Sequence, residues 1–157
     1  MIRALTPDDV AVVDAQLPLN RLDTWREGGS TYLVAWDGET PVGHAHLTWQ
    51  GTTLGVPELQ DVHVAPRRRR EGFASELTRA AERLAAERGH DRLSLSVGIA
   101  NHAARRLYAR LGYGDAGFSP QRVQGTILLR GKLFEVDDTL VYLVKQIAVD
   151  SAPARSS

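Results

Sequence analysis

The chain has 157 residues, of which 43% are hydrophobic, and its 19 basic and 19 acidic residues give a net charge of zero. This composition is typical of one soluble globular domain, which we expect at residues 1–150, followed by a disordered tail at 151–157. The absence of cysteine excludes disulfides, thiolate nucleophiles and cysteine-ligated metals, and the neutral net charge argues against a nucleic-acid partner.

No segment has the roughly 20 consecutive apolar residues of a membrane span, and the N-terminus carries acidic residues where a signal peptide has its apolar core. We therefore expect a cytoplasmic protein with no membrane partner. His44 and His46 are two residues apart, but a metal site needs at least a third ligand, and none is evident nearby. No metal site is predicted.

The first half of the chain has the patterns of short strands and short helices. Thr6 and Pro7 are typical of a helix start, and the Asp-Gly-Glu-Thr stretch at 37–40 is typical of a hairpin turn. In chain order we expect a strand at 2–5, a helix to 13, a short helix at 22–26, and strands at 31–36, 41–49 and 59–64.

The second half contains the clearest helix, at 73–88, whose apolar residues recur at helical spacing and which Gly89 ends. A strand at 93–97 and a helix at 102–111, capped by Asn101, follow. The last expected elements are strands at 123–129 and 140–147, joined by a loop. Strands and helices alternate in the central half, so the predicted fold class is α/β with a mixed sheet.

The segment from Val62 to Arg79 carries the strongest functional signal. It reads VHVAPRRRREGFASELTR, in which a strand end and four arginines precede a glycine-containing turn and a helix start. The unpaired first-turn amides and the dipole of a helix bind anions, and small residues at 72 and 74 allow close approach. The spacing Arg-x-x-Gly-x-Ala is neither the GxGxxG dinucleotide fingerprint nor the Walker sequence. It predicts a diphosphate held by backbone amides.

A second motif, NHAARRLY from Asn101 to Tyr108, lies on the next helix and is followed by Gly112 and Tyr113. With both motifs in this order, the chain resembles the GNAT superfamily of N-acetyltransferases over most of its length. The resemblance implies a mixed, mostly antiparallel central sheet flanked by helices. It also implies acetyl-CoA as acetyl donor and an enzyme that transfers the acetyl group directly to a primary amine in a ternary complex.

The resemblance assigns the acetyl-CoA site residue by residue. The backbone of Val62, His63 and Val64 is expected to pair with the pantetheine arm like an added strand. Asn101 is expected to contact the same arm, and Tyr108 to lie near the sulfur. Backbone amides and positive potential around the turn are expected to hold the pyrophosphate, and the residues that supply them are Arg69, Arg70, Glu71, Gly72, Phe73, Ala74 and Ser75.

Acetyl transfer from a thioester to an amine needs a neutral amine, and the departing thiolate benefits from a proton. Tyr108 is the candidate acid. Glu58 is the candidate base, because it lies at the offset from the Gly72 turn where histone-acetylating members carry their catalytic glutamate. Asp61 and His63 remain alternatives: alternation puts them on the face opposite Glu58, unless the bulge expected in this fold breaks the phase.

The acceptor is not specified by the sequence. The resemblance implies an acceptor pocket between residues 17–28 and the loop at 125–138, and both segments carry acids that suit a cationic small molecule or a lysine side chain. The partner is therefore an amine of a small molecule, protein or peptide. The sequence does not specify the oligomeric state, although homodimers are common among the proteins that it resembles. The alternative function is a non-catalytic acyl-CoA-binding or sensor module, which a missing tyrosine or a disrupted Gly72 turn would favour.

Overall fold

The computed structural model describes residues 1–147, and the tail expected at 151–157 lies outside them. The helices of this region are η1 (Pro7–Asp9), α1 (Val10–Gln16), α2 (Leu22–Glu27), η2 (Pro66–Arg68), α3 (Phe73–Glu87) and α4 (His102–Arg110). The strands are β1 (Ile2–Ala4), β2 (Ser30–Asp37), β3 (Thr40–Thr48), β4 (Glu58–Val64), β5 (Arg92–Gly98), β6 (Gly114–Asp115), β7 (Gln121–Leu129) and β8 (Lys132–Gln146).

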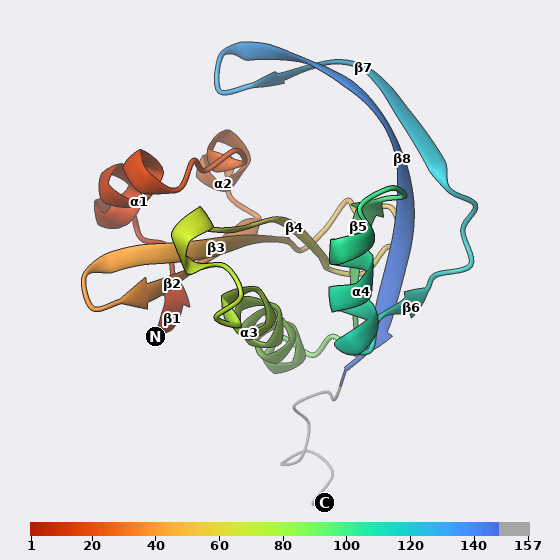
Figure 1. Ribbon diagram of the computed structural model, residues 1–157, viewed down its shortest axis with the longest axis horizontal. Coiled ribbons are helices and arrows are strands. Elements are labelled where there is room, and N and C mark those ends of the chain that lie inside the picture. The colour runs from red at the N-terminus through yellow and green to blue at the C-terminus, as the bar shows by residue number, and fades with distance from the viewer. Residues whose placement is uncertain (148–157) are drawn as a thin grey trace, which may run out of the picture.

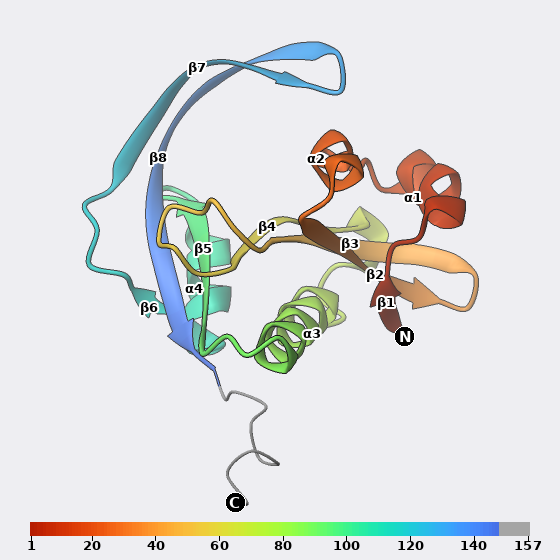
Figure 2. The ribbon, with the colours of Figure 1, turned by 180° about the vertical axis from the view of Figure 1, so that it is seen from behind.

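All the strands belong to one sheet, in the order β1-β2-β3-β4-β5-β8-β6, with β7 paired to β8. Every neighbouring pair is antiparallel except β4 and β5, so the expected mixed, mostly antiparallel sheet is confirmed. Helices α3 and α4 lie on one side of the sheet and α1 and α2 on the other (Figures 1 and 2). None of the helices in residues 1–147 combines the length and apolar content that crossing a membrane requires.

Each side of the sheet has its own buried cluster. Leu77 and Ala81 of α3 pack with Leu47 and Leu93 of the strands beneath them. On the other side, Tyr32 is fully buried in a cluster whose further members are Leu5, Val13, Leu17, Leu19, Leu22, Val34, Trp36 and Ala65. Burying a large apolar side chain stabilises the fold by about 1.5–3 kcal/mol, so these clusters fix both helical layers to the sheet.

Two irregularities shape the centre of the sheet. The parallel β4–β5 ladder has only two rungs, Glu58 with Ser94 and Leu59 with Leu95, so β4 and β5 separate after Leu59. On its other edge, β4 carries one extra residue, because the register against β3 shifts between His44 and His46 and Asp61 has a φ of +50°. This is the bulge that the sequence analysis expected, and it breaks simple alternation along β4.

The last two strands differ from the prediction. The segment 132–139, predicted as a loop, is the first part of the 15-residue β8, and it pairs with β7 across a two-residue turn. Arg130 and Gly131 form that turn with φ values of +54° and +78°, as hairpin turns of this length require. Most of these residues are exposed. Because an exposed strand need not be apolar, the sequence of this segment lacks the hydrophobic pattern from which a strand is predicted. The two-residue β6 was missed, and α1 extends three residues beyond the predicted end.

Candidate active site

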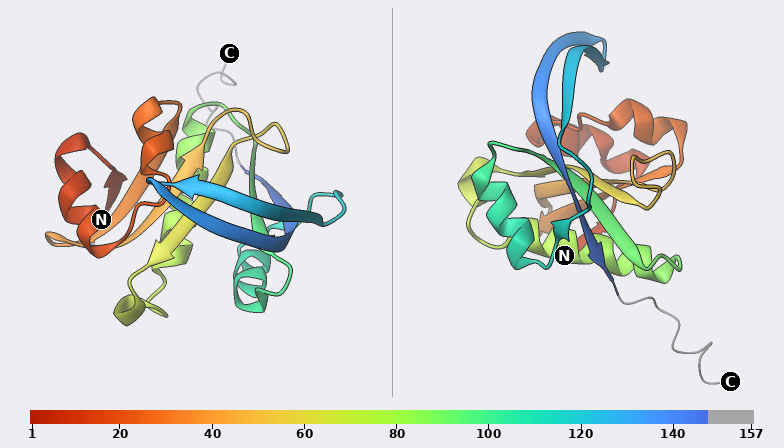
Figure 3. Two further views of the ribbon diagram at one scale, coloured as in Figure 1. Left: turned by 90° about the horizontal axis from the view of Figure 1, so that it is seen from above. Right: turned by 90° about the vertical axis from the view of Figure 1, so that its right-hand side faces the viewer.

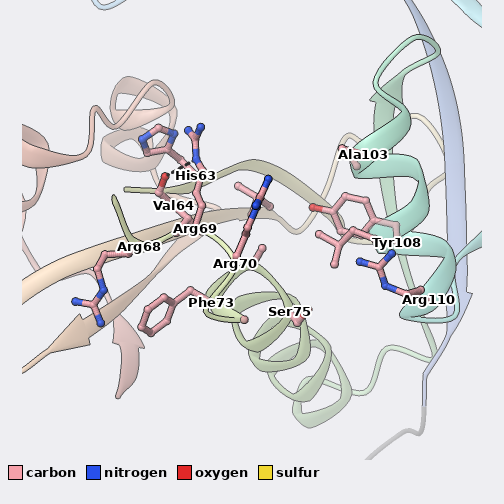
Figure 4. Close-up of a pocket in the computed structure, with 15 residues that line it drawn as sticks. His63, Val64, Arg68, Arg69, Arg70, Phe73, Ser75, Ala103, Tyr108 and Arg110 are labelled. Atoms are coloured by element: carbon pink, nitrogen blue, oxygen red, sulfur yellow. Dashed lines mark hydrogen bonds between the residues drawn. The ribbon is translucent and has the colours of Figure 1, made fainter. Parts of the chain in front are cut away.

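A cavity of about 570 Å³ opens between β4, the start of α3 and α4. Figure 4 shows its lining residues, which come from these three elements and the arginine-rich turn. Of the residues predicted to bind the donor, Glu71 and Asn101 do not line the cavity, whereas these do: Val62, His63, Val64, Arg69, Arg70, Gly72, Phe73, Ala74, Ser75 and Tyr108. The two sequence motifs therefore meet at one cavity, although they are separated in the chain.

The start of α3 fits a diphosphate. Gly72 has a φ of +88°, and a Cβ built on it would meet no atom within 4 Å, so the turn faces open space. Glu76 is the first residue whose amide donates to a backbone carbonyl at this end, that of Gly72 at 3.0 Å. The amides of the first helical turn, from Phe73 to Ser75, are thus available to anion oxygens.

The arginines that line the cavity differ in whether they form ion pairs. Arg68 donates to Asp37 at 2.9 Å and to Glu71 at 3.0 Å, which accounts for Glu71 lying outside the lining. Arg70 and Arg110 also line the cavity, and within residues 1–147 neither forms an ion pair. Their charge is free to compensate a polyanionic group.

Asn101 caps the start of α4. Its Oδ1 accepts a hydrogen bond from the Ala104 amide at 3.2 Å, which is the helix cap that the sequence predicts. The same helix turns Ala103, Ala104 and Leu107 toward the cavity, and the sequence analysis missed these residues. Helical spacing counted back from Tyr108 would have found Ala104 one turn earlier.

Tyr108 is buried, with 7% of its surface exposed, and Figure 4 shows its hydroxyl directed toward the cavity. Its ring packs edge-on against Tyr113 at a centroid distance of 5.8 Å. Burial raises the pKa of the Tyr108 hydroxyl above its ordinary value, so the group stays protonated at neutral pH. A proton donor for a departing thiolate needs this state.

On the opposite side of the sheet, Glu58, Gln60 and His46 form a buried chain. Gln60 Nε2 donates to Glu58 Oε2 at 2.6 Å, and Gln60 Oε1 lies 3.3 Å from His46 Nδ1. Burial lowers the pKa of His46 to about 4, so the ring is neutral and Nδ1 donates to the amide oxygen. Within residues 1–147, Glu58 Oε1 and His46 Nε2 are buried without a hydrogen-bond partner. Both atoms accept hydrogen bonds, so they suit a ligand that carries N–H or O–H groups.

Both carboxylate oxygens of Asp61 accept a hydrogen bond. Asp61 accepts from the Tyr32 hydroxyl at 2.6 Å and from Asn20 Nδ2 at 3.3 Å. Its backbone oxygen also lies 3.0 Å from His44 Nδ1. Burial, followed by the nearby Asp61 charge, raises the pKa of Tyr32, which keeps this hydroxyl a donor. Asp61 therefore connects β4 to the α1–α2 segment.

The third base candidate, His63, lines the donor cavity, and burial lowers its pKa below the ordinary value. Of the three candidates, Glu58 has the buried oxygen without a partner among the described residues. No group of three or more His, Asp or Glu side chains within residues 1–147 could hold a metal ion.

The sequence profile of the acetyltransferase (GNAT) family matches residues 2–113, a range that contains both motifs and the cavity. The chain belongs to this family. The sequence predicts acetyl-CoA as the acetyl donor of such a protein. The free amides at the start of α3 and the unpaired arginines fit the diphosphate of this donor.

Individual relatives agree with this assignment. The chain is 33% identical to the mycothiol acetyltransferase of Clavibacter sepedonicus over 99 residues, which are 63% of this chain and 32% of that protein. It thus matches about a third of that relative's length. Among solved structures, the IAA acetyltransferase from Bacillus cereus has a TM-score of 0.67 at 18% identity, covering 94% of this chain and 99% of that one. A GNAT acetyltransferase from Elizabethkingia anophelis, with acetyl-CoA bound, has a TM-score of 0.68 at 16% identity, covering 94% and 97%.

Proposed function

We propose that this GNAT protein transfers the acetyl group directly to a primary amine in a ternary complex, with Glu58 as base and Tyr108 as acid. One observation carries the proposal: β4 and β5 stop pairing after Leu59. The gap between the two strands lies between the donor cavity on one face of the sheet and Glu58 on the other. Tyr108 lines the cavity, and Glu58, one residue before the last paired rung, has a buried oxygen without a partner among the described residues.

The donor is held by residues of three elements. The amides of Phe73, Ala74 and Ser75 bind the pyrophosphate, and Arg69 and Arg70 add positive charge beside them. Beyond Leu59 the edge of β4 no longer pairs with β5, so the backbone at 62–64 is available to the pantetheine arm. When bound, acetyl-CoA supplies an acetyl thioester, and the protein supplies proton transfer and positioning.

Glu58 and Tyr108 move the protons that the transfer requires. An alkylamine with a pKa of ~10.4 is mostly protonated at neutral pH, so Glu58 Oε1 takes one proton directly or through water. The amine nitrogen then bonds to the acetyl carbonyl carbon while the carbon–sulfur bond breaks. Tyr108 protonates the departing sulfur and regains the proton that the nitrogen loses. The products are an amide and CoA with a free thiol.

The first test follows CoA release with a thiol-reactive dye against small-molecule amines, amino acids and lysine peptides. Because the chain has no cysteine, the protein adds no thiol background. We expect amine-dependent release and initial-rate lines that intersect when both substrates are varied, as a ternary complex requires. Parallel lines would contradict direct transfer. Acetyl-CoA binding without release on any amine would contradict catalysis and favour a binding module.

A further inference from the structure

The β7–β8 hairpin projects from the sheet as a long arm, formed by residues 121–139. In Figures 1 and 3 it arches away from β5 and bends back toward α1 and α2. Its tip is fastened there, because Arg130 Nη2 donates to Asp14 Oδ2 of α1 at 2.8 Å. Arg130 holds the pKa of Asp14 below its ordinary value, so the ion pair persists at neutral pH. The arm thus spans the α1–α2 side of the sheet.

The two faces of the arm differ in chemistry. Ile127 lies opposite Phe134 and Leu129 opposite Lys132, and alternation adds Val123 and Val136 to the same face, with Asp138 at its base opposite Val123. The other face is mostly polar: Arg122, Gln124, Thr126, Glu135, Asp137 and Thr139, with Leu128 and Leu133 near the tip.

The apolar face is the one turned toward the body of the protein. A cavity of about 340 Å³ lies between the tip and the α1–α2 connection, lined by Asn20, Leu129, Arg130, Lys132 and Phe134. Phe134 is still 46% exposed and Ile127 36%, so this face is only partly covered by the described residues. Exposed apolar side chains around a cavity mark a binding surface.

A hydrogen bond links the tip cavity to β4, where further hydrogen-bond acceptors lie. Asn20 of the tip cavity bonds Asp61, which neighbours the buried chain of Gln60, His46 and Glu58. The unpartnered atoms of that chain, Glu58 Oε1 and His46 Nε2, both accept hydrogen bonds. The surface as a whole is therefore apolar on the arm and suited to an amine near β4.

We infer that the acceptor is an amine with an apolar aliphatic or aromatic body, which packs against the apolar face of the arm while its nitrogen faces Glu58. The inference rests on the proposed function and names its substrate class. A polyamine fits poorly near the tip, because a second ammonium there would lie against apolar side chains or beside the cation of Lys132.

Two of the three arm acids that favoured a cationic acceptor in the sequence lie elsewhere, whereas the third, Asp138, is at the base of the inner face, opposite Val123. Glu135 and Asp137 belong to the polar face of the arm, and Asp137 pairs with Arg122 at 3.1 Å. Alternation along β8 places Glu135 and Asp137 on the face opposite to that of Phe134, Val136 and Asp138. The structure thus assigns the apolar residues between these acids to the acceptor side.

The test compares 2-phenylethylamine with spermidine as acceptors, in wild type and in two matched variants. Phe134→Ser changes the apolar face, and Leu133→Ser changes a neighbouring, 73% exposed side chain on the other face. We expect wild type to prefer 2-phenylethylamine in kcat/KM. Phe134→Ser should lower this kcat/KM about tenfold or more, while the value for Leu133→Ser stays within twofold of wild type.

A binding measurement separates this inference from the proposed function. If no amine is acetylated, an NMR titration of 2-phenylethylamine into the CoA-loaded protein still reports whether the apolar face binds it, and weaker binding in Phe134→Ser supports the inference. A preference for spermidine, equal effects of the two variants, or no binding of 2-phenylethylamine would overturn it. A loss of self-association in Phe134→Ser, with unchanged amine kinetics, would instead assign the face to a second copy of the chain.

Discussion

The donor cavity and the proposed acceptor side of this acetyltransferase are built by different means. On the donor side, each part comes from a short continuous segment: a strand end, a glycine turn and a helix start at 62–75, and one helix face around Tyr108. On the proposed acceptor side, Asp61 of β4 bonds Asn20 and Tyr32, and Asn20 lines a cavity with the tip of the arm, although these segments are remote in sequence. A local sequence motif is therefore enough to predict the donor site, whereas the proposed acceptor site depends on packing between segments that are far apart in the chain.

The largest effect is expected where the two sides meet, at Glu58. Glu58→Gln keeps the shape of the side chain but removes the base, so kcat should fall by about 10³ with little change in acetyl-CoA affinity. Steady-state kinetics and a CoA titration measure the two quantities. If Asp61→Asn loses kcat to this extent and Glu58→Gln does not, the base is on the other candidate and our assignment is wrong.

Tyr108 tests the donor side alone. Tyr108→Phe should lower kcat by about 10² while the Kd of acetyl-CoA stays constant, because only the proton donor is lost. Tyr113→Phe is the matched control, since this hydroxyl bonds Glu82 at 2.8 Å and does not line the cavity. Equal turnover in Tyr108→Phe and wild type would remove Tyr108 from the mechanism.

The buried His46 makes the stability of the acceptor side dependent on pH. Its pKa is about 4 in the folded protein and 6.5 ordinarily, so the unfolded chain binds the proton first as the pH falls. The contribution of His46 to the free energy of unfolding is fully present above pH 6.5 and is lost as the pH falls toward 4. The loss between pH 7 and pH 5 is about 2 kcal/mol. The lowered pKa of His63 acts in the same direction.

Urea unfolding at pH 5, 6 and 7 measures this dependence. His46→Gln should flatten it, even though the variant is less stable overall. His102→Gln, which changes an exposed histidine, should keep the wild-type slope. A slope unchanged by His46→Gln would show that the buried ring is not the titrating group.

Gly72 gives the smallest expected effect, about a tenfold weaker Kd for acetyl-CoA in Gly72→Val. The new side chain is strained at a φ of +88° and enters the space that the phosphates need. Gly89→Val is a close control, because Gly89 has a φ of +86° and open surroundings at the other end of α3. Both variants should lose stability, but only Gly72→Val should lose affinity. Equal affinities of the two variants for acetyl-CoA would show that the diphosphate does not lie at the Gly72 turn.

The sequence by itself determined most of the elements, the family and the grouping of both motifs at one donor cavity. These features depend on short-range patterns: periodic apolar residues on α3, a glycine turn, and a capping Asn101. Glu71 and Asn101 show the limit of this reasoning, because a motif position does not reveal that one side chain pairs with Arg68 and the other caps a helix.

Only the tertiary structure decided the acceptor side. The bulge at Asp61 sets which β4 side chains share a face, and the 15-residue β8 converts a predicted loop into an arm fastened by Arg130 and Asp14. Neither follows from local propensity: the first depends on register against β3, and the second on pairing and contacts between residues far apart in the chain. Alternation along β8 also separates Phe134 from Glu135 and Asp137, which are its near neighbours in the sequence.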